Sequence, residues 1–432
     1  MHSLHREKLF SLLSESHGTD AVLISGAAVQ YRYGTDHEYP FRQESNFQYL
    51  TGVWEPDFKL LLDVATREYH LFAPKRDAQF AVWHGFVKSL DELRAEYQPD
   101  HLHVVEDLPA VLARIKPKTV HVLWSTDAAF ASWLGYTPSD GYLSDMLAHC
   151  RVIKTEGELA LLRRANQVAS AAHDAVKAAI RPGMFEYEVK ALYEYECQKR
   201  GCVFAPYNGI HGSGTASAIL HYTENHRQLK DGDIYLIDAG AEVQGYAADL
   251  TRTWAINGKA TTLQKEIYAA VLRMQTSAID AAKPGVAMED LQLLSARVLM
   301  DDLAGIGLLR GTTHELMEHN IFALFFPHGL GHFLGLDTHD PGGYPKGVQR
   351  IDRPGLRYLR ARRTLETGMV VTIEPGCYFI PALLEPAFAN PAMNRFLNVE
   401  KLTSMLDFGG IRIEDNLIIT PDGNENMTKA IK

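Results

Sequence analysis

The sequence has few cysteines, no excess of basic residues and no long apolar run, and each absence excludes a class of protein. Four cysteines in 432 residues, none in a CxxC pair, do not make a disulfide framework and favour a reducing compartment. Lys and Arg number 43 against 53 Asp and Glu, and this net charge of −10 argues against a nucleic-acid partner. No apolar run reaches the length of a transmembrane helix, about 18 residues, so no membrane partner is expected. The first residues lack a signal-peptide pattern, so we expect a cytoplasmic protein.

What is present is a globular composition with an α/β pattern. Hydrophobic residues make up 46% of the chain and charged residues 22%, and the length predicts two or three domains. Short apolar runs such as Ala21–Ser25 and Tyr69–Ala73 alternate with helical stretches, which predicts a small mixed α/β domain. A long helix is predicted over Glu156–Ile180. The predicted fold class is therefore α/β (α+β), with an amino-terminal domain over 1–154 and a second domain over 155–432.

Two segments of the second domain resemble each other. Residues 178–192 and 280–294 both read as a helix, a Pro-Gly pair, a short gap and a second helix. Duplication of an α/β half and two unrelated helical hairpins are equally open interpretations of this loose match.

Two aspartates lie in strand patterns joined by a short connection. Ile234–Ala241 alternates apolar residues around Asp238, and Tyr246–Ile256 carries Asp249. Alternate residues of a strand share one face, so Asp238 continues an apolar row. A carboxylate in that position is costly to bury unless it is paired or bound to a metal ion. The pattern predicts a hairpin with two carboxylates facing each other, either a metal site or an exposed pair at a sheet edge.

Histidines cluster further along the chain. Phe326–His332 reads FPHGLGH and contains His328 and His332, and His339 follows. Imidazole is the commonest metal ligand and a proton shuttle near neutral pH, and glycine permits close backbone approach. A polar loop with incidental histidines is the alternative interpretation.

Two glutamates lie in apolar strand settings, Glu374 in VVTIEPG and Glu414 in GIRIEDN. Taken with the preceding motifs they complete a candidate ligand set: Asp238, Asp249, His332, Glu374 and Glu414. Four carboxylates and one imidazole suit two divalent metal ions, Mn²⁺ first, with Co²⁺ or Zn²⁺ also compatible. Two such ions can share a hydroxide and polarise a substrate oxygen, which is hydrolase chemistry.

The order of these motifs resembles the pita-bread metallopeptidases, a family that includes methionine aminopeptidase, aminopeptidase P, prolidase and creatinase. The first third, best in Tyr39–Asn46, is similar to the non-catalytic domain of prolidase and aminopeptidase P. The resemblance therefore extends over nearly the whole chain. It implies an aminopeptidase P/prolidase-type domain over 1–154 and a pita-bread catalytic domain over 155–432.

The segment between His339 and Glu374 resembles the insertion of prolidases, with GGYP and PGLRYLR elements. In that branch the arginine matching Arg360 binds the carboxylate of a carboxy-terminal proline, a contact that a guanidinium makes bidentately. The resemblance therefore implies hydrolysis of Xaa-Pro dipeptides. A solvated basic face is the alternative interpretation of this arginine-rich stretch.

The resemblance also implies roles for other side chains. Glu374 would take the water proton and pass it towards the proline nitrogen, and His328 would steady the oxyanion. Further positions that match the family are the substrate-contacting His221, His339, Tyr207 and Trp83 and the ligand-orienting Tyr207, Thr251 and Arg412. Trp83 matches a tryptophan that reaches the partner subunit's pocket in dimeric relatives, which implies a homodimer.

Three rival functions share these motifs. Aminopeptidase P, which removes the first residue from longer X-Pro peptides, differs only in the insertion and Arg360. A catalytically inactive, peptidase-like binding protein would have lost metal ligands, and creatinase-type hydrolysis does without the metals. The intact ligand set argues against these last two.

Overall fold

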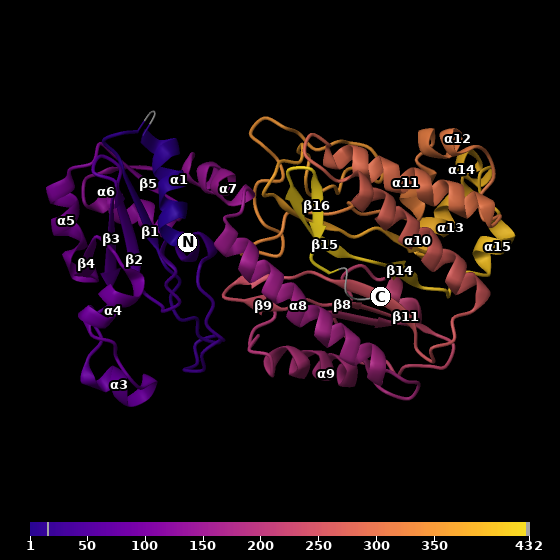
Figure 1. Cartoon of the computed structure of the whole chain (residues 1–432), viewed down its shortest axis with the longest axis horizontal. Coiled ribbons are helices and arrows are strands. Elements are labelled where there is room, and N and C mark those ends of the chain that lie inside the picture. The colour runs from indigo at the N-terminus through magenta and orange to yellow at the C-terminus, as the bar shows by residue number, and fades with distance from the viewer. Residues whose placement is uncertain (15–16, 429–432) are drawn as a thin grey trace. The chain divides into compact units, whose positions relative to one another are not determined.

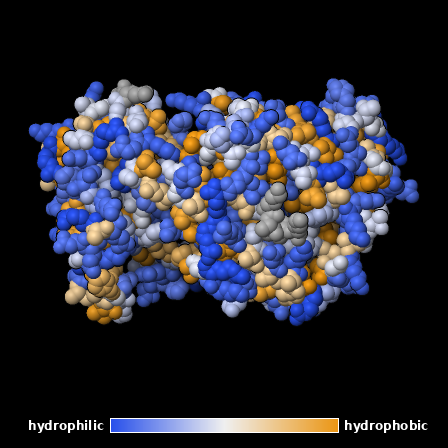
Figure 2. Space-filling view, in the orientation of Figure 1, coloured by the Kyte–Doolittle hydropathy of each residue, from blue (hydrophilic) through white to orange (hydrophobic). Residues whose placement is uncertain are grey.

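The computed structural model describes residues 1–14 and 17–428. Its contacts divide the chain into two compact units, Met1–Cys150 and Arg151–Lys432, four residues before the expected boundary at 154. Among the described residues, no helix has both the length and the apolar character needed to cross a bilayer. The face in Figure 2 is largely hydrophilic in both units, with apolar residues scattered over it.

The first unit is built on one mixed six-stranded sheet with strand order β4-β3-β2-β1-β5-β6. The pairs β1–β2 and β2–β3 are antiparallel and the others are parallel. The strands are β1 Ala21–Ser25, β2 Lys59–Asp63, β3 Glu68–Ala73, β4 His101–Val104, β5 Thr119–Val122 and β6 Thr137–Ser139. The helices are α1 His2–Ser14, α2 Ser45–Thr51, α3 Ala78–His84, α4 Leu90–Tyr97, α5 Leu108–Ile115, α6 Ser125–Trp133 and α7 Leu143–Val152, which ends in the second unit, with the 3₁₀ turn η1 Val105–Asp107.

The second unit places antiparallel strands between two helix pairs (Figure 1). Its sheets have the orders β11-β8-β7 and β12-β15-β16, with two further pairs, β9–β10 and β13–β14. The strands are β7 Ile210–Ser213, β8 Ile234–Asp238, β9 Glu242–Val243, β10 Tyr246–Ala247, β11 Thr251–Ala255, β12 Val370–Ile373, β13 Gly376–Tyr378, β14 Gly410–Arg412, β15 Asp415–Thr420 and β16 Gly423–Asn426. The helices are α8 Glu156–Ala179, α9 Glu186–Gln198, α10 Thr262–Ala281, α11 Met288–Gly305, α12 Thr313–Glu318, α13 Pro381–Ala389, α14 Pro391–Asn394 and α15 Val399–Thr403, with η2 Gly214–Ala218 and η3 Ile321–Leu324.

Helix α8 begins and ends as its sequence predicts. Thr155 accepts a hydrogen bond from the Glu158 amide, and the Glu158 carboxylate caps Thr155 in return, which closes a capping box. The helix stops before Pro182, whose ring cannot continue it. Its apolar stripe, which includes Val168 and Ala172, packs on Tyr235 of β8. Tyr235 therefore faces the helices, and Asp238, an odd number of residues further along the strand, lies on the opposite face of the sheet.

The two similar segments make the same backbone contacts. The amide of Gly183 donates to Leu229 O at 2.9 Å, and the amide of Gly285 donates to Leu365 O, also at 2.9 Å. Each Pro-Gly turn is followed by an isolated β-bridge and then by the second helix of its pair, α9 or α11. The equivalence favours duplication over two unrelated hairpins.

Candidate metal centre and substrate pocket

The first pair of carboxylates lies on a long, twisted hairpin. Its turn, Gln244-Gly245, has positive φ at both positions (49° and 85°), as a type I′ turn requires. In the β8–β11 register Asp238 lies opposite Thr251. The flanking bonds Ala239 N to Leu250 O and Ala248 N to Ala241 O continue this register and put Asp249 opposite Gly240. Asp238 and Asp249 are therefore diagonal neighbours on one face, not the directly opposed pair that the sequence suggested.

The second pair comes from another antiparallel ladder. Ile373 pairs with Asp415 and Gly376 pairs with Arg412, so Glu374 and Glu414 lie opposite each other between these pairs. The regular strand stops there because the next residue, a proline, has no amide to donate. Like charges directly opposite one another destabilise a sheet unless something neutralises them.

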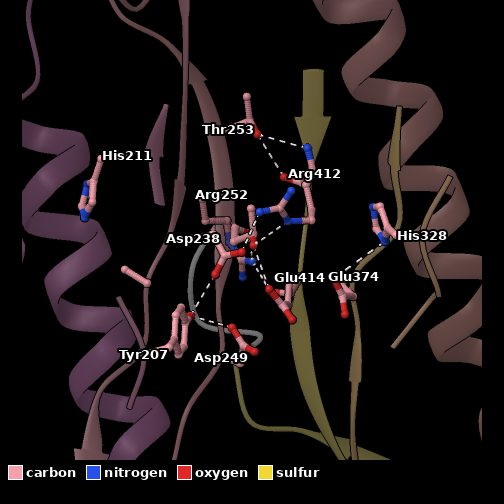
Figure 3. A network of polar contacts seen from close by, with 12 residues as sticks. Tyr207, His211, Asp238, Asp249, Arg252, Thr253, His328, Glu374, Arg412 and Glu414 are labelled. Atoms are coloured by element: carbon pink, nitrogen blue, oxygen red, sulfur yellow. Dashed lines mark hydrogen bonds and ion pairs between the residues drawn. The ribbon is translucent and has the colours of Figure 1, made fainter. Parts of the chain in front are cut away.

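One bridge joins the two ladders. Thr251 and Glu414 form an isolated β-bridge, in which the Glu414 amide donates to Thr251 O at 3.1 Å. The Thr251 hydroxyl also donates to Glu414 Oε2 at 2.7 Å, and Arg252 donates to the Glu414 carbonyl at 2.6 Å. Figure 3 shows the four carboxylates converging from the two ladders. The role of Thr251 in orienting a metal ligand stays a prediction, and the hydroxyl contact with Glu414 is the geometry that this role would need.

His332 reaches the cluster because its loop lies against β12. A Cβ at Gly331 would stand 1.9 Å from Thr372 O, so only glycine permits this approach. The His332 Nδ1–H donates to the Phe333 carbonyl at 2.9 Å. Its Nε2 therefore faces Asp249 Oδ2 at 3.3 Å and a Glu374 oxygen at 3.5 Å. Three electron-rich atoms in such contact require a proton or a metal ion between them.

The electrostatics of the cluster fit a divalent metal ion. Burial raises the pKa of Glu374 to about 7. Burial and the neighbouring charges of Asp249 and Glu374 hold the pKa of Glu414 well above its usual range. Within the described residues, Glu414 Oε1 is buried without a hydrogen-bond partner. Asp249, His332 and Glu414 offer ligand atoms within 4.8 Å of one another, a donor set suited to hard or borderline ions.

Tyr207 and Arg412 hold the aspartates from opposite sides. The Tyr207 hydroxyl lies 2.9 Å from Asp238 Oδ1 and 2.5 Å from Asp249 Oδ1 (Figure 3). Arg412 donates to Asp238 Oδ2 at 2.6 Å and to the Thr251 hydroxyl at 3.1 Å. These contacts are compatible with an orienting role for Tyr207 and Arg412, which stays a prediction.

Arg412 also starts a hydrogen-bond chain that reaches His328. It donates to the Tyr378 hydroxyl at 2.9 Å, and that hydroxyl donates to His328 Nε2 at 2.8 Å. His328 Nδ1–H donates in turn to the Gly329 carbonyl. Burial lowers the pKa of His328 to about 3, so the ring is neutral. Both ring nitrogens are engaged in this conformation, and the contact of His328 with the substrate oxyanion stays a prediction. Sequence reasoning missed Tyr378, although it lies four residues after Glu374.

A cavity of about 670 Å³ opens onto the carboxylate cluster. Its lining includes the predicted substrate residues His221, His328, His339, Arg360 and Tyr207 and all the predicted metal ligands, Asp238, Asp249, His332, Glu374 and Glu414. Trp83 does not line this cavity; it lies on α3 in the first unit and is 77% exposed. The volume suits a small peptide.

Gln292 of α11 is a positioning residue that sequence reasoning missed. Its side chain is fully buried, and its amide nitrogen donates to the carbonyls of His328 and Gly355 at 3.3 Å each. Its amide oxygen accepts from the Leu330 amide. One side chain thus ties the histidine loop to the segment that carries Arg360.

We expect Gln292→Leu to lower the kcat/KM of the site about tenfold or more, because three backbone groups lose their hydrogen-bond partner and the histidine loop is held less firmly. Steady-state kinetics and a thermal melt measure the effect. Gln275→Leu is the matched control, since Gln275 is also buried and its Nε2 has no hydrogen-bond partner among the described residues. Equal kinetics in the two variants would remove Gln292 from the positioning role.

Two family models match the chain, Metallopeptidase family M24 over residues 160–421 and Aminopeptidase P, N-terminal domain, over residues 2–124. The Xaa-Pro dipeptidase of Homo sapiens is 40% identical, over 99% of this chain and 90% of that protein. A probable Xaa-Pro aminopeptidase of Verticillium alfalfae is 36% identical, over 96% of this chain and 91% of that protein.

Solved structures agree with these matches. Aminopeptidase P from Escherichia coli with the inhibitor Pro-Leu superposes with a TM-score of 0.84 at 32% identity, covering 100% of this chain and 96% of that one. Aminopeptidase PepP of Pseudomonas aeruginosa gives a TM-score of 0.86 at 30% identity, with 100% and 95% covered. The predicted fold class is confirmed, with an aminopeptidase P-type first domain and a pita-bread second domain.

Proposed function

The chain belongs to metallopeptidase family M24, and on this premise we propose that it is a metal-dependent Xaa-Pro dipeptidase that releases carboxy-terminal proline. The observation that carries the proposal is the place of Arg360, which lines the same cavity as the carboxylate cluster. A Cβ at Gly329 would lie 2.9 Å from Leu359 Cα, so this glycine lets the arginine-bearing segment pack against the histidine loop. A cation at this place in the pocket can measure the length of a peptide by its terminal carboxylate.

We propose two divalent ions, Mn²⁺ first, held by Asp238, Asp249, His332, Glu374 and Glu414. When bound, such ions lower the pKa of water and polarise the scissile carbonyl. This assignment is supported by the donor set and by the raised pKa values of Glu374 and Glu414, because buried carboxylates are costly to ionise unless a cation lies beside them. Removal of the ions by a chelator, followed by separate addition of Mn²⁺, Co²⁺ and Zn²⁺, identifies the metal that restores the activity.

The remaining chemistry belongs to side chains of the pocket. Glu374, at the edge of the cluster and 18% exposed, can accept a proton from the attacking water and return it to the proline nitrogen. Arg360, His221 and His339 line the cavity and would hold the proline carboxylate. With its proline carboxylate held there, a dipeptide would place its scissile bond beside the cluster, and a longer peptide lacks the carboxylate at that distance.

The test compares hydrolysis of Gly-Pro and Gly-Pro-Ala by the wild type and by Arg360→Ala, each with Mn²⁺. We expect the wild type to prefer the dipeptide, and Arg360→Ala to raise the KM for Gly-Pro about 100-fold, because charge-assisted hydrogen bonds to the carboxylate are lost. Arg357→Ala is the control, since Arg357 is exposed and pairs with the exposed Asp352. A tripeptide cleaved as well as the dipeptide, with no effect of Arg360, would instead assign aminopeptidase P activity.

That second function has its own support. Two relatives at 36–37% identity bear the name probable Xaa-Pro aminopeptidase, and the Escherichia coli structure described above is an aminopeptidase P. The cytoplasmic location, the homodimer with Trp83 at the partner's pocket and the boundary at residue 154 stay predictions.

A further inference from the structure

A group of imidazoles and one carboxylate lies on the sheet of the first unit, far along the chain from the catalytic residues. Glu68 and His70 are two apart on β3, and His101 and His103 are two apart on β4. The strands are parallel, with His70 in register with His101. Since alternate residues of a strand share a face, all four side chains project from the same face of the sheet. The strand register alone therefore puts the four side chains on one face of the sheet.

The contacts within the group leave one nitrogen without a partner. His70 Nδ1 lies 3.1 Å from His103 Nε2, so a single proton joins the two rings. His70 is 2% exposed, and its Nε2 has no hydrogen-bond partner among the described residues. This nitrogen lies 3.9 Å from Glu68 Oε2, and His101 Nε2 lies 3.4 Å from Glu68 Oε1. When His70 Nδ1–H donates to His103, the buried Nε2 presents a lone pair towards the carboxylate.

We propose that Glu68, His70 and His101 bind a zinc ion, with His103 as the residue that orients His70. Ligand atoms of the three all lie within 4.8 Å of one another. Two imidazoles and one carboxylate, with a water in the fourth position, are a donor set that Zn²⁺ takes in tetrahedral sites. Mn²⁺ and Mg²⁺ prefer sets richer in oxygen, so the two metal sites of the chain differ in preference.

Neighbouring side chains restrain the proposed ligand Glu68 and the orienting residue His103. The Thr66 hydroxyl donates to Glu68 Oε2 at 3.0 Å and so fixes the carboxylate. The Phe72 ring stacks on His103, with centroids 4.9 Å apart, which restrains the orienting ring. The cation of Arg114 lies near His70, but its side chain is exposed and water screens its repulsion.

The experiment counts zinc in the full-length protein. Wild type, His101→Ala, Glu68→Gln and the control His37→Ala are dialysed to equilibrium against free Zn²⁺, and bound metal is measured by elemental analysis. His101 is 42% exposed, so its removal leaves the buried sheet face intact. His37 is exposed and lies outside the group. We expect His101→Ala and Glu68→Gln to bind one zinc equivalent fewer than wild type, and His37→Ala to bind the same number.

Equal zinc content in wild type and His101→Ala would overturn the proposal and leave a His–Glu ion pair at the sheet edge. A second readout separates the proposed ion from those of the catalytic centre. Mn²⁺-dependent hydrolysis of Gly-Pro is expected to be unchanged in His101→Ala. If zinc content and hydrolysis fall together, the lost ion belongs to the catalytic centre, and the proposal fails.

Discussion

Asp249→Asn is expected to lower kcat/KM for Gly-Pro at least about 1,000-fold, equivalent to about 4 kcal/mol of transition-state stabilisation. Asp249 lies between Tyr207 at 2.5 Å and His332 at 3.3 Å, so it contacts the hydroxyl on one side and the imidazole on the other. An amide keeps the shape and can still accept from the tyrosine. It removes the charge that makes this oxygen a ligand for a divalent ion. Steady-state kinetics with saturating Mn²⁺ measure the loss.

Melting temperatures distinguish the loss of a metal ligand in Asp249→Asn from a failure of the variant to fold. In chelator-treated protein the pKa of Asp249 is lowered: burial alone would raise it, but the contacts with His332 and Tyr207 outweigh burial, so the charge stabilises the fold and Asp249→Asn is expected to lower the melting temperature. In wild type Mn²⁺ is expected to raise the melting temperature, and in the variant this gain is expected to shrink. Asp231→Asn, at an exposed aspartate, is the control. Full activity in Asp249→Asn would remove this residue from the metal centre.

The metal-ligand candidates were predictable because each stands in a local pattern. Asp238 continues the apolar alternation of its strand, and on that face Ile234 packs into the core. The hairpin was predictable as well, since its connection is short and contains glycine. A period of two and a motif of adjacent glycines and histidines are properties of neighbouring residues. A single sequence displays such properties directly.

Other features of the site could not be predicted from the sequence, because they depend on how distant segments pair. Glu374 lies opposite Glu414, forty residues later, only because two short ladders share one register. Gln292 reaches the histidine loop from a helix, and an isolated glutamine in an apolar stripe has no pattern of its own. Tyr378 could have been considered from the sequence, because it closely follows the TIEPG motif. Its role nevertheless follows only from its contacts with Arg412 and His328.

A second large effect is expected at Asp340, which neutralises two buried cations. Its carboxylate lies 2.6 Å from Arg151 Nη2 and 2.7 Å from Lys154 Nζ, and all three side chains are 3% exposed or less. Asp340→Asn leaves the cations buried with weaker partners, a change that typically costs about 3–5 kcal/mol. Denaturant unfolding at pH 7 measures it. Because Asp340 follows His339 directly, kcat/KM for Gly-Pro is expected to fall as well.

The stability that Asp340 contributes is expected to depend on pH. Burial alone would raise the pKa of Asp340, but Arg151 and Lys154 outweigh it and hold the pKa below its usual range. The contribution of Asp340 to stability is therefore complete above its unfolded pKa of about 4 and is lost as the pH falls through the lower folded pKa. The difference in the free energy of unfolding between wild type and Asp340→Asn should stay constant from pH 7 down to about 5 and narrow below 4.

Asp337→Asn is the matched control. Asp337 contacts Arg151 at 2.6 Å, but its side chain is 42% exposed. Water therefore compensates for the lost charge, and we expect a loss of about 1 kcal/mol or less. Equal losses in the two variants would mean that burial does not decide the strength of this ion pair.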